Sequence, residues 1–143
     1  MQNVQDPPVI VIHSLAHAVA AVGAAAEADC AIVLASAPAA GHYAGAGWFR
    51  ALIAAAREAV PQARFSALID CGDDAGAAMA AIRAGIEALV FTGRADVADR
   101  LIDIAGQQDA VVLRHRPSAA LDLGDLFFAD AKTLQRQCAK ALS

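Results

Sequence analysis

The stretch FSALIDCGDDAGAAMAAIRAGIEALVFTG, residues 65–93, contains a complete strand–helix–strand unit. The apolar run at 65–69 predicts a strand that is covered on both faces, because it lacks the polar alternation of a half-exposed strand. A helix is predicted over 75–84, since Gly85 is a residue favoured just beyond a helix end. A second apolar run at 88–91 predicts the next strand. Strands joined through a helix lie parallel, so this stretch indicates an α/β fold.

The same alternation runs along the rest of the 143 residues. Further strands are predicted at 9–12, 31–35 and 110–113, and further helices at 15–28, 47–60, 95–107 and 130–142. The sequence therefore predicts a single α/β domain over 1–143, built from repeated βα units around a mainly parallel five-stranded sheet. A three-layer sandwich is the preferred arrangement and a half (β/α)-barrel the alternative. Residues 126–128 are either a short sixth strand or a packed loop.

Composition and charge exclude several classes of protein. Fifteen acidic against eleven basic residues give a net charge of −4, which argues against a nucleic-acid-binding surface. No apolar run is long enough for a membrane span, and the polar start of the chain does not have the pattern of a signal peptide. Cys30, Cys71 and Cys138 are far apart in the sequence and form no CxxC pair. This pattern favours reduced thiols in the cytoplasm over a disulfide framework or a zinc site.

The first third of the chain is poor in charge. Residues 1–49 contain three acids and no Lys or Arg, and within 15–28 the polar side chains are only His17 and Glu27. A helix that is apolar on all sides is normally buried on all sides. We therefore expect the helix at 15–28 to pack against a second subunit in a homo-oligomer. The alternative is a poorly hydrated alanine surface.

Polar residues follow the predicted strands, and parallel strands bring their carboxyl ends to one edge of the sheet, where ligands bind. A site for a small molecule, phosphorylated or otherwise anionic, is expected at this edge. The binding candidates are His13, Ser14, His42, Tyr43, Asp70, Cys71, Thr92 and Arg116. The wider set at this edge adds His17, Ser36, Asp73, Arg94, Arg114 and His115. A glycine-rich stretch at 39–47 leads into the second helix, where backbone N–H groups can hold an anion; otherwise it is a flexible connection.

Several candidates have alternative readings. Asp70 is a possible general base and Cys71 a possible nucleophile. In the structural alternative, Asp73 or Asp74 caps a helix and Cys71 is a small buried residue. Arg114, His115 and Arg116 either bind a phosphate or carboxylate at the sheet edge, or alternate residues among them point to solvent. No metal site is predicted, because Ser14 as an N-cap would place His13 before the helix that carries His17. No motif identifies a catalytic pair or a cofactor.

The segment ALIDCGDDAGAAMAAIRAGIEALVFTG, residues 67–93, resembles a βαβ segment of aldolase-type (β/α) barrels. It shares with them a polar strand end, a short glycine-containing turn, an alanine-rich helix ending in AG and a strand ending in glycine. The resemblance implies a phosphate or sugar-phosphate site near Gly93. No lysine follows any predicted strand, so Schiff-base aldolase chemistry has no candidate residue.

The strand ends also resemble those of receiver domains of two-component signalling. Asp70, Thr92 and the Arg116–Pro117 pair follow the third, fourth and fifth predicted strands in that family's order. The first strand ends in His13–Ser14 where receivers carry acids, and an arginine replaces their lysine. This resemblance implies at most a degenerate receiver-like module. The alternative to a ligand-binding function is a non-catalytic, oligomeric interaction module, which the charge-poor residues 1–49 and the apolar helix at 15–28 favour.

Overall fold

The chain folds around a six-stranded parallel sheet in the computed structural model, which describes residues 6–143. The strands are β1 (Val9–Val11), β2 (Ile32–Ala35), β3 (Phe65–Asp70), β4 (Ala88–Val90), β5 (Val111–Leu113) and β6 (Leu121–Asp122). The longer helices are α1 (Leu15–Ala28), α3 (Ala46–Ala59), α4 (Ala75–Arg83), α5 (Ala95–Gly106) and α6 (Ala131–Leu142). The predicted class, an α/β fold of repeated βα units, is confirmed.

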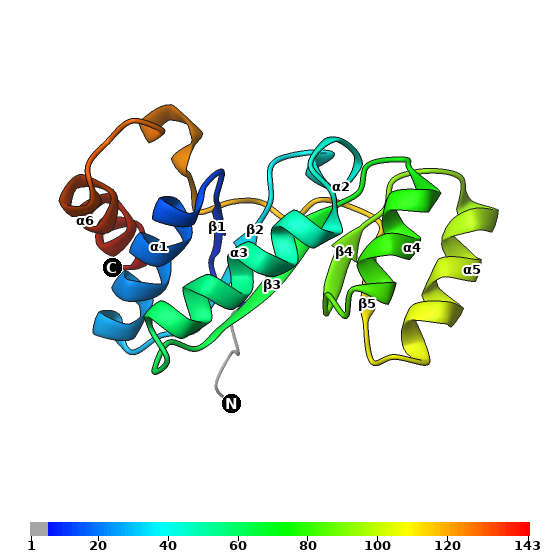
Figure 1. The fold of residues 1–143 in the computed structure, drawn as a ribbon, viewed down its shortest axis with the longest axis horizontal. Coiled ribbons are helices and arrows are strands. Elements are labelled where there is room, and N and C mark those ends of the chain that lie inside the picture. The colour runs from blue at the N-terminus through cyan, green and yellow to red at the C-terminus, as the bar shows by residue number, and fades with distance from the viewer. Residues whose placement is uncertain (1–5) are drawn as a thin grey trace.

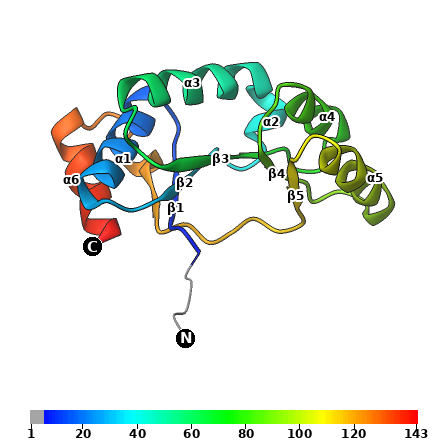
Figure 2. The same ribbon diagram turned by 90° about the horizontal axis from the view of Figure 1, so that it is seen from below.

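The strand order is β5-β4-β3-β2-β1-β6, so the first five strands are neighbours in chain order. Successive right-handed crossovers in one direction put their helices on the same side of the sheet. Figures 1 and 2 show this arrangement: the helices line one face of a curved sheet, and none of the helices within residues 6–143 covers the other. The structure therefore has the half-barrel arrangement, and the preferred three-layer sandwich was wrong. Receiver domains order their strands 2-1-3-4-5, so that resemblance does not extend to the fold.

The sheet buries apolar side chains on both faces, which explains its continuous apolar strands. Toward the helices, Ile10, Leu34, Ile69 and Leu89 are fully buried in the main core. Val9, Val11, Ala35, Leu68 and Val90 form a separate apolar cluster. Since side chains alternate along a strand, this second cluster lies on the face without helices, which we call the concave face.

Helix α1 is covered within its own chain. It packs against α6 and α3, and half of its fourteen residues are buried. Ser14 caps it as predicted, its Oγ accepting a hydrogen bond from His17 N at 3.1 Å. The apolar composition of α1 thus follows from three-sided packing in one protomer. Its role in a homo-oligomer stays a prediction.

The chain between β5 and β6 differs most from expectation. After β5 it passes below the concave face to the opposite edge of the sheet (Figure 2), and there β6 pairs with β1. We call residues 114–120 the crossover. The sixth strand therefore lies at Leu121–Asp122, before the 3₁₀ helix η1 (Leu123–Leu126), and not at 126–128. The glycine-rich stretch at 39–47 contains an unpredicted short helix, α2 (Ala40–Tyr43).

Candidate functional site

A cavity of about 250 Å³ lies at the carboxyl ends of β1 and β2. Its walls come from these strand ends, from α2 and the start of α3, and from the chain after η1. We call it the aromatic cavity; its lining residues are Ile12, His13, Ala37, Ala40, Tyr43, Ala44, Trp48 and Phe127. Two predicted ligand-binding residues, His13 and Tyr43, therefore meet there. Trp48 and Phe127 were not predicted as site residues.

A short hydrogen bond to Asp122 holds the ring of His13. His13 Nε2 donates to Asp122 Oδ1 across 2.6 Å, and the two residues are neighbours because β6 pairs with β1. A Cβ atom at position 124 would lie 2.9 Å from His13 Nε2, so Gly124 permits this close approach. Partial burial raises the pKa of Asp122, but hydrogen bonds from His13 and from the Gly124 backbone outweigh it, and the pKa is lowered. Asp122 is therefore a carboxylate at neutral pH and fixes the orientation of His13.

The buried ring of His17 fixes the backbone of His13 by a hydrogen bond. His17 is completely buried, and its Nδ1 accepts a hydrogen bond from the backbone N of His13 at 3.1 Å. Its ring packs edge-on against Phe127, with 5.5 Å between centroids. Burial and the neighbouring His13 lower the pKa of His17, opposed by the Phe127 backbone and Asp122. The His17 ring is therefore neutral, with its proton on Nε2, which has no hydrogen-bond partner among residues 6–143.

The aromatic cavity offers a bound molecule three kinds of interaction. Because the Nε2–H of His13 is directed to Asp122, the Nδ1 atom of the neutral ring can accept a hydrogen bond or a proton from a bound molecule, and the protonated ring can donate to an anion. The faces of Tyr43, Trp48 and Phe127 can contact a flat or apolar group. The N-terminus of α3 lies at the same cavity, since Trp48 is in its first turn and Gly45 provides no side-chain cap. Its free N–H groups favour an anion.

Asp70 and Arg116, two further candidates, bind each other. Arg116 donates to Asp70 Oδ2 across 2.9 Å and to the Ser36 carbonyl across 2.7 Å. Asp70 is 5% exposed, and it also accepts a hydrogen bond from Gly72 N. Arg114 likewise donates to the carbonyls of Phe91 and Gly93. Both arginines thus attach the crossover to the strand ends, and their guanidinium groups are occupied by protein acceptors.

The other predicted residues are spread along the same edge. Cys71 is fully buried, and burial, then Asp70 and Asp74, raise the pKa of its thiol to about 12. His42 Nδ1 lies 2.6 Å from Asp74 Oδ2 on the surface, and Asp74 caps α4 by accepting from Ala77 N. Thr92 is exposed and does not line the aromatic cavity. Ser14 serves as the cap of α1.

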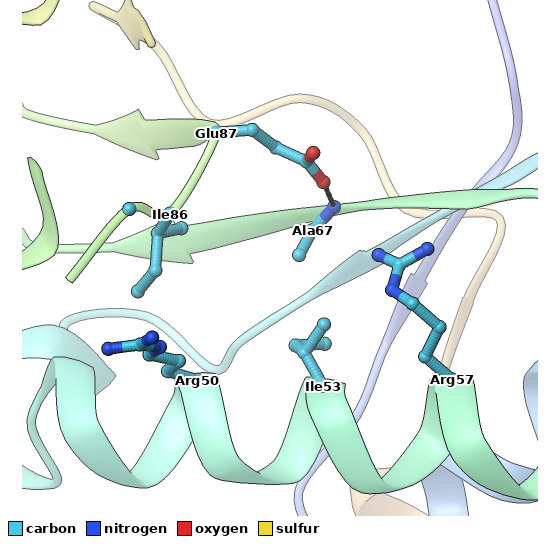
Figure 3. Close-up of a pocket in the computed structure, with 7 residues that line it drawn as sticks. Arg50, Ile53, Arg57, Ala67, Ile86 and Glu87 are labelled. Carbon is cyan, nitrogen blue, oxygen red and sulfur yellow. Dashed lines mark hydrogen bonds between the residues drawn. The ribbon is translucent and has the colours of Figure 1, made fainter. Parts of the chain in front are cut away.

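A smaller cavity lies at the other end of the sheet. Figure 3 shows Arg50, Ile53 and Arg57 on α3 facing Ala67 and Glu87, and the enclosed volume is about 100 Å³. Glu87 Oε1 accepts a hydrogen bond from Ala67 N at 2.6 Å, and the Arg57 guanidinium lies 4.4 Å from the centre of the Phe65 ring. The small volume of this cavity and the opposite charges of its arginines and Glu87 favour a structural role over ligand binding.

Within residues 6–143, no three His, Cys, Asp or Glu side chains are grouped to hold a metal ion. No helix of this part of the chain is long and apolar enough to cross a membrane.

Sequence reasoning missed Asp122, Trp48 and Phe127. Trp48 falls within the helix predicted at 47–60, and it is 39% exposed in the structure. Asp122 and Phe127 lie between the strand predicted at 110–113 and the helix predicted at 130–142, where the sequence predicts only a short strand or a packed loop at 126–128. The available signal was Phe127–Phe128, two adjacent aromatics in a chain with only 5% aromatic residues; Phe128 is 96% exposed and Phe127 48%.

The sequence matches no protein-family model and no curated protein sequence. Among solved structures, the fold is similar to that of a "putative fructose-1,6-biphosphate aldolase" from Coccidioides immitis, with a TM-score of 0.60 and 16% sequence identity. The match covers 74% of this chain and 39% of that protein, so the chain spans less than half of its length. At this identity the likeness concerns the fold alone. It agrees with the aldolase-barrel resemblance expected from residues 67–93, and the chain is an α/β protein whose parallel sheet resembles part of an aldolase barrel.

Proposed function

We propose that this protein binds a small anionic molecule with a flat or apolar part in the aromatic cavity. The observation that carries the proposal is the convergence of His13, fixed by Asp122, with three aromatic side chains at the carboxyl edge of the sheet. This edge is where parallel α/β folds bind ligands. In the proposal, Tyr43, Trp48 and Phe127 contact the apolar part.

The N-terminus of α3 and His13 are the groups proposed to bind the anion. Arg114 and Arg116, expected from the sequence to do so, are already hydrogen-bonded to protein acceptors. An anion at the α3 N-terminus would meet unpaired N–H groups and the positive end of the helix dipole. A phosphate monoester with an aromatic group combines the two requirements.

Trp48 is the only tryptophan of the chain and lines the cavity, so its fluorescence reports on binding. We would titrate phenyl phosphate, inorganic phosphate, phenol and fructose 1,6-bisphosphate, the last because of the aldolase with a similar fold. Phenyl phosphate should change Trp48 emission saturably and at lower concentration than phosphate or phenol alone. His13→Ala should weaken this binding about tenfold, the usual effect of losing one charge-assisted hydrogen bond.

The matched control is His115→Ala, because His115 is exposed on the crossover. Its affinity should equal that of the unaltered protein. The proposal is wrong if none of the four probes gives a saturable change, or if His13→Ala binds phenyl phosphate as tightly as the unaltered protein. Native mass spectrometry of the purified protein would also show any retained ligand by its mass.

A second candidate function is self-association through the first helix. Leu15 in the first turn of α1 is 45% exposed, and it lines a groove of about 380 Å³ between α1 and α6 with Ala16, Val19, Ala20, Ala131 and Gln135. Exposed apolar side chains beside a groove are typical of an interface. Sedimentation velocity of Leu15→Glu tests it, with Ile102→Glu, an equally exposed position on α5, as the control. An oligomer that only Leu15→Glu dissociates would support this function, and a monomer at micromolar concentration would contradict it.

A further inference from the structure

The concave face of the sheet contains a further cavity, distinct from the two described above. It lies between the strands and the crossover and has a volume of about 320 Å³. We call it the concave cavity; its lining residues are Asp6, Pro7, Val9, Val33, Ser66, Ala67, Leu68, Ala88, Leu113 and Pro117. Its volume is at the lower end of the range of about 300–1,000 Å³ typical of small-molecule sites.

Residues of four adjacent strands form the floor of this cavity. Val9, Val33 and Ser66 are partners in one row across β1, β2 and β3, and Leu68 pairs with Ala88 in the next row. Because side chains alternate along each strand, these residues all point away from the helices. The floor is thus a rigid, mainly apolar surface.

The crossover borders the cavity on the other side. It passes below the concave face in Figure 2, and the hydrogen bonds of Arg116 to Asp70 and to the Ser36 carbonyl hold it at the strand ends. Pro117, the next residue, forms part of the cavity wall. A cavity of about 320 Å³ has room for a small molecule.

The chemistry of the wall restricts the occupant further. Ser66 has the only uncharged hydrogen-bonding side chain among the lining residues, and Asp6 the only charged one. No Lys, Arg or His among them could neutralise an anion. Burying an unpaired charge is costly, whereas apolar surface gains free energy on leaving water. The wall therefore suits an uncharged molecule with a hydrocarbon body and one hydrogen-bonding group for Ser66.

We infer that the concave cavity is a binding site for a small uncharged hydrocarbon-like molecule with a single hydroxyl or similar group. An adjoining hollow, which shares Asp6, Pro7, Val9 and Pro117 with it, gives the molecule a route from solvent. This site is independent of the one proposed at the carboxyl edge, so either can be correct without the other.

The test is an NMR titration of the full chain with 1-hexanol and, separately, with hexanoate. 1-Hexanol should shift the backbone amide signals of Val33, Ser66 and Ala88 saturably, and leave those of Tyr43 and Trp48 unchanged. Hexanoate has the same chain length but a carboxylate, and it should bind more than about tenfold more weakly, because its charge would be buried without a partner. This comparison uses the unaltered protein and does not depend on any variant folding.

Ala88→Leu fills part of the cavity and should weaken 1-hexanol binding about tenfold or more, since the ligand loses apolar contact area. Ala54→Leu is the matched control, because Ala54 is exposed on α3; its affinity should be unchanged. If Ala88→Leu does not fold, Val33→Phe tests the same loss of volume. The inference is overturned if 1-hexanol gives no saturable shifts, if hexanoate binds equally well, or if a folded cavity-filling variant binds as tightly as Ala54→Leu.

Discussion

Arg116 and Asp70 are 46 positions apart in the sequence, and the guanidinium of one donates to the carboxylate of the other across 2.9 Å. Asp70 ends β3 in the middle of the sheet, whereas Arg116 lies on the crossover. The same guanidinium reaches the Ser36 carbonyl after β2. One side chain thus links the crossover to two central strands, and this link determines where the segment lies below the concave face.

Replacing Arg116 should destabilise the fold. Arg116→Ala leaves the buried Asp70 carboxylate without its charged partner, and we expect a loss of about 2 kcal/mol in unfolding free energy. This is below the loss for a fully buried pair because the Arg116 side chain is 27% exposed. Urea denaturation measures it, with Arg136→Ala on the surface of α6 as the control. A loss no larger than that of the control would show that the link does not stabilise the crossover.

Ser14 should contribute to stability and not to ligand binding. Its Oγ accepts the hydrogen bond of His17 N in the first turn of α1, so Ser14→Ala should cost about 1 kcal/mol, as for other N-caps. Ser118→Ala, on the exposed part of the crossover, should cost nothing measurable. Phenyl phosphate affinity, followed by Trp48 fluorescence, should be equal in both variants. If Ser14→Ala alone binds phenyl phosphate more weakly, Ser14 contributes to ligand binding as well as to the helix cap.

The sequence was sufficient to predict each of the first five strands to within about two residues at either end. Strands such as Phe65–Asp70 are buried on both faces, so their continuous apolar pattern differs clearly from that of the amphipathic helices. No comparable sequence pattern predicts the side of the sheet on which each helix packs. An apolar stripe on α3 shows that it covers a sheet, but the strand order decides which face. β6, with two residues, is too short to produce a pattern.

The candidate site was predicted in its location and only partly in its members. The carboxyl edge follows from the parallel strands, which is why His13 and Tyr43 were identified. Asp122 reaches His13 only because the crossover brings β6 beside β1, a long-range pairing with no local sequence signal. Arg116 and Asp70 were predicted from their residue types, and the structure pairs their charges with each other, so their role in ligand binding stays a prediction.

Of the three cysteines, only Cys30 should react readily in the folded protein. It is half-buried, whereas Cys71 and Cys138 are buried, and burial raises the pKa of their thiols to about 12 and about 11. The thiolate is the reactive form, so iodoacetamide at neutral pH should modify Cys30 first. Mass spectrometry should find one modified site in the native protein and three in urea. Rapid native modification of Cys71 would contradict its structural role and revive the nucleophile interpretation.

The buried ring of His17 should make stability depend on pH in a defined window. The pKa of His17 lies below its ordinary value of 6.5, chiefly because of burial and then because of His13. As the pH falls below 6.5, the unfolded chain takes up a proton at His17 that the folded chain does not. The free energy of unfolding therefore decreases toward acid pH in this range. The lowered pKa values of Asp74, Asp122 and Asp130 act only below their ordinary value of 3.8, so the two windows are separate.

His17→Asn tests this dependence, because the amide oxygen can still accept the hydrogen bond of His13 N but does not titrate. We expect the unfolding free energy of the unaltered protein, measured by urea denaturation, to fall between about pH 7 and about pH 5. His17→Asn should show a smaller slope over this interval, whatever its stability at neutral pH. His115→Asn, on the exposed crossover, should keep the slope of the unaltered protein. Equal slopes in the unaltered protein and His17→Asn would mean that the His17 ring takes up its proton as readily in the folded chain as in the unfolded one.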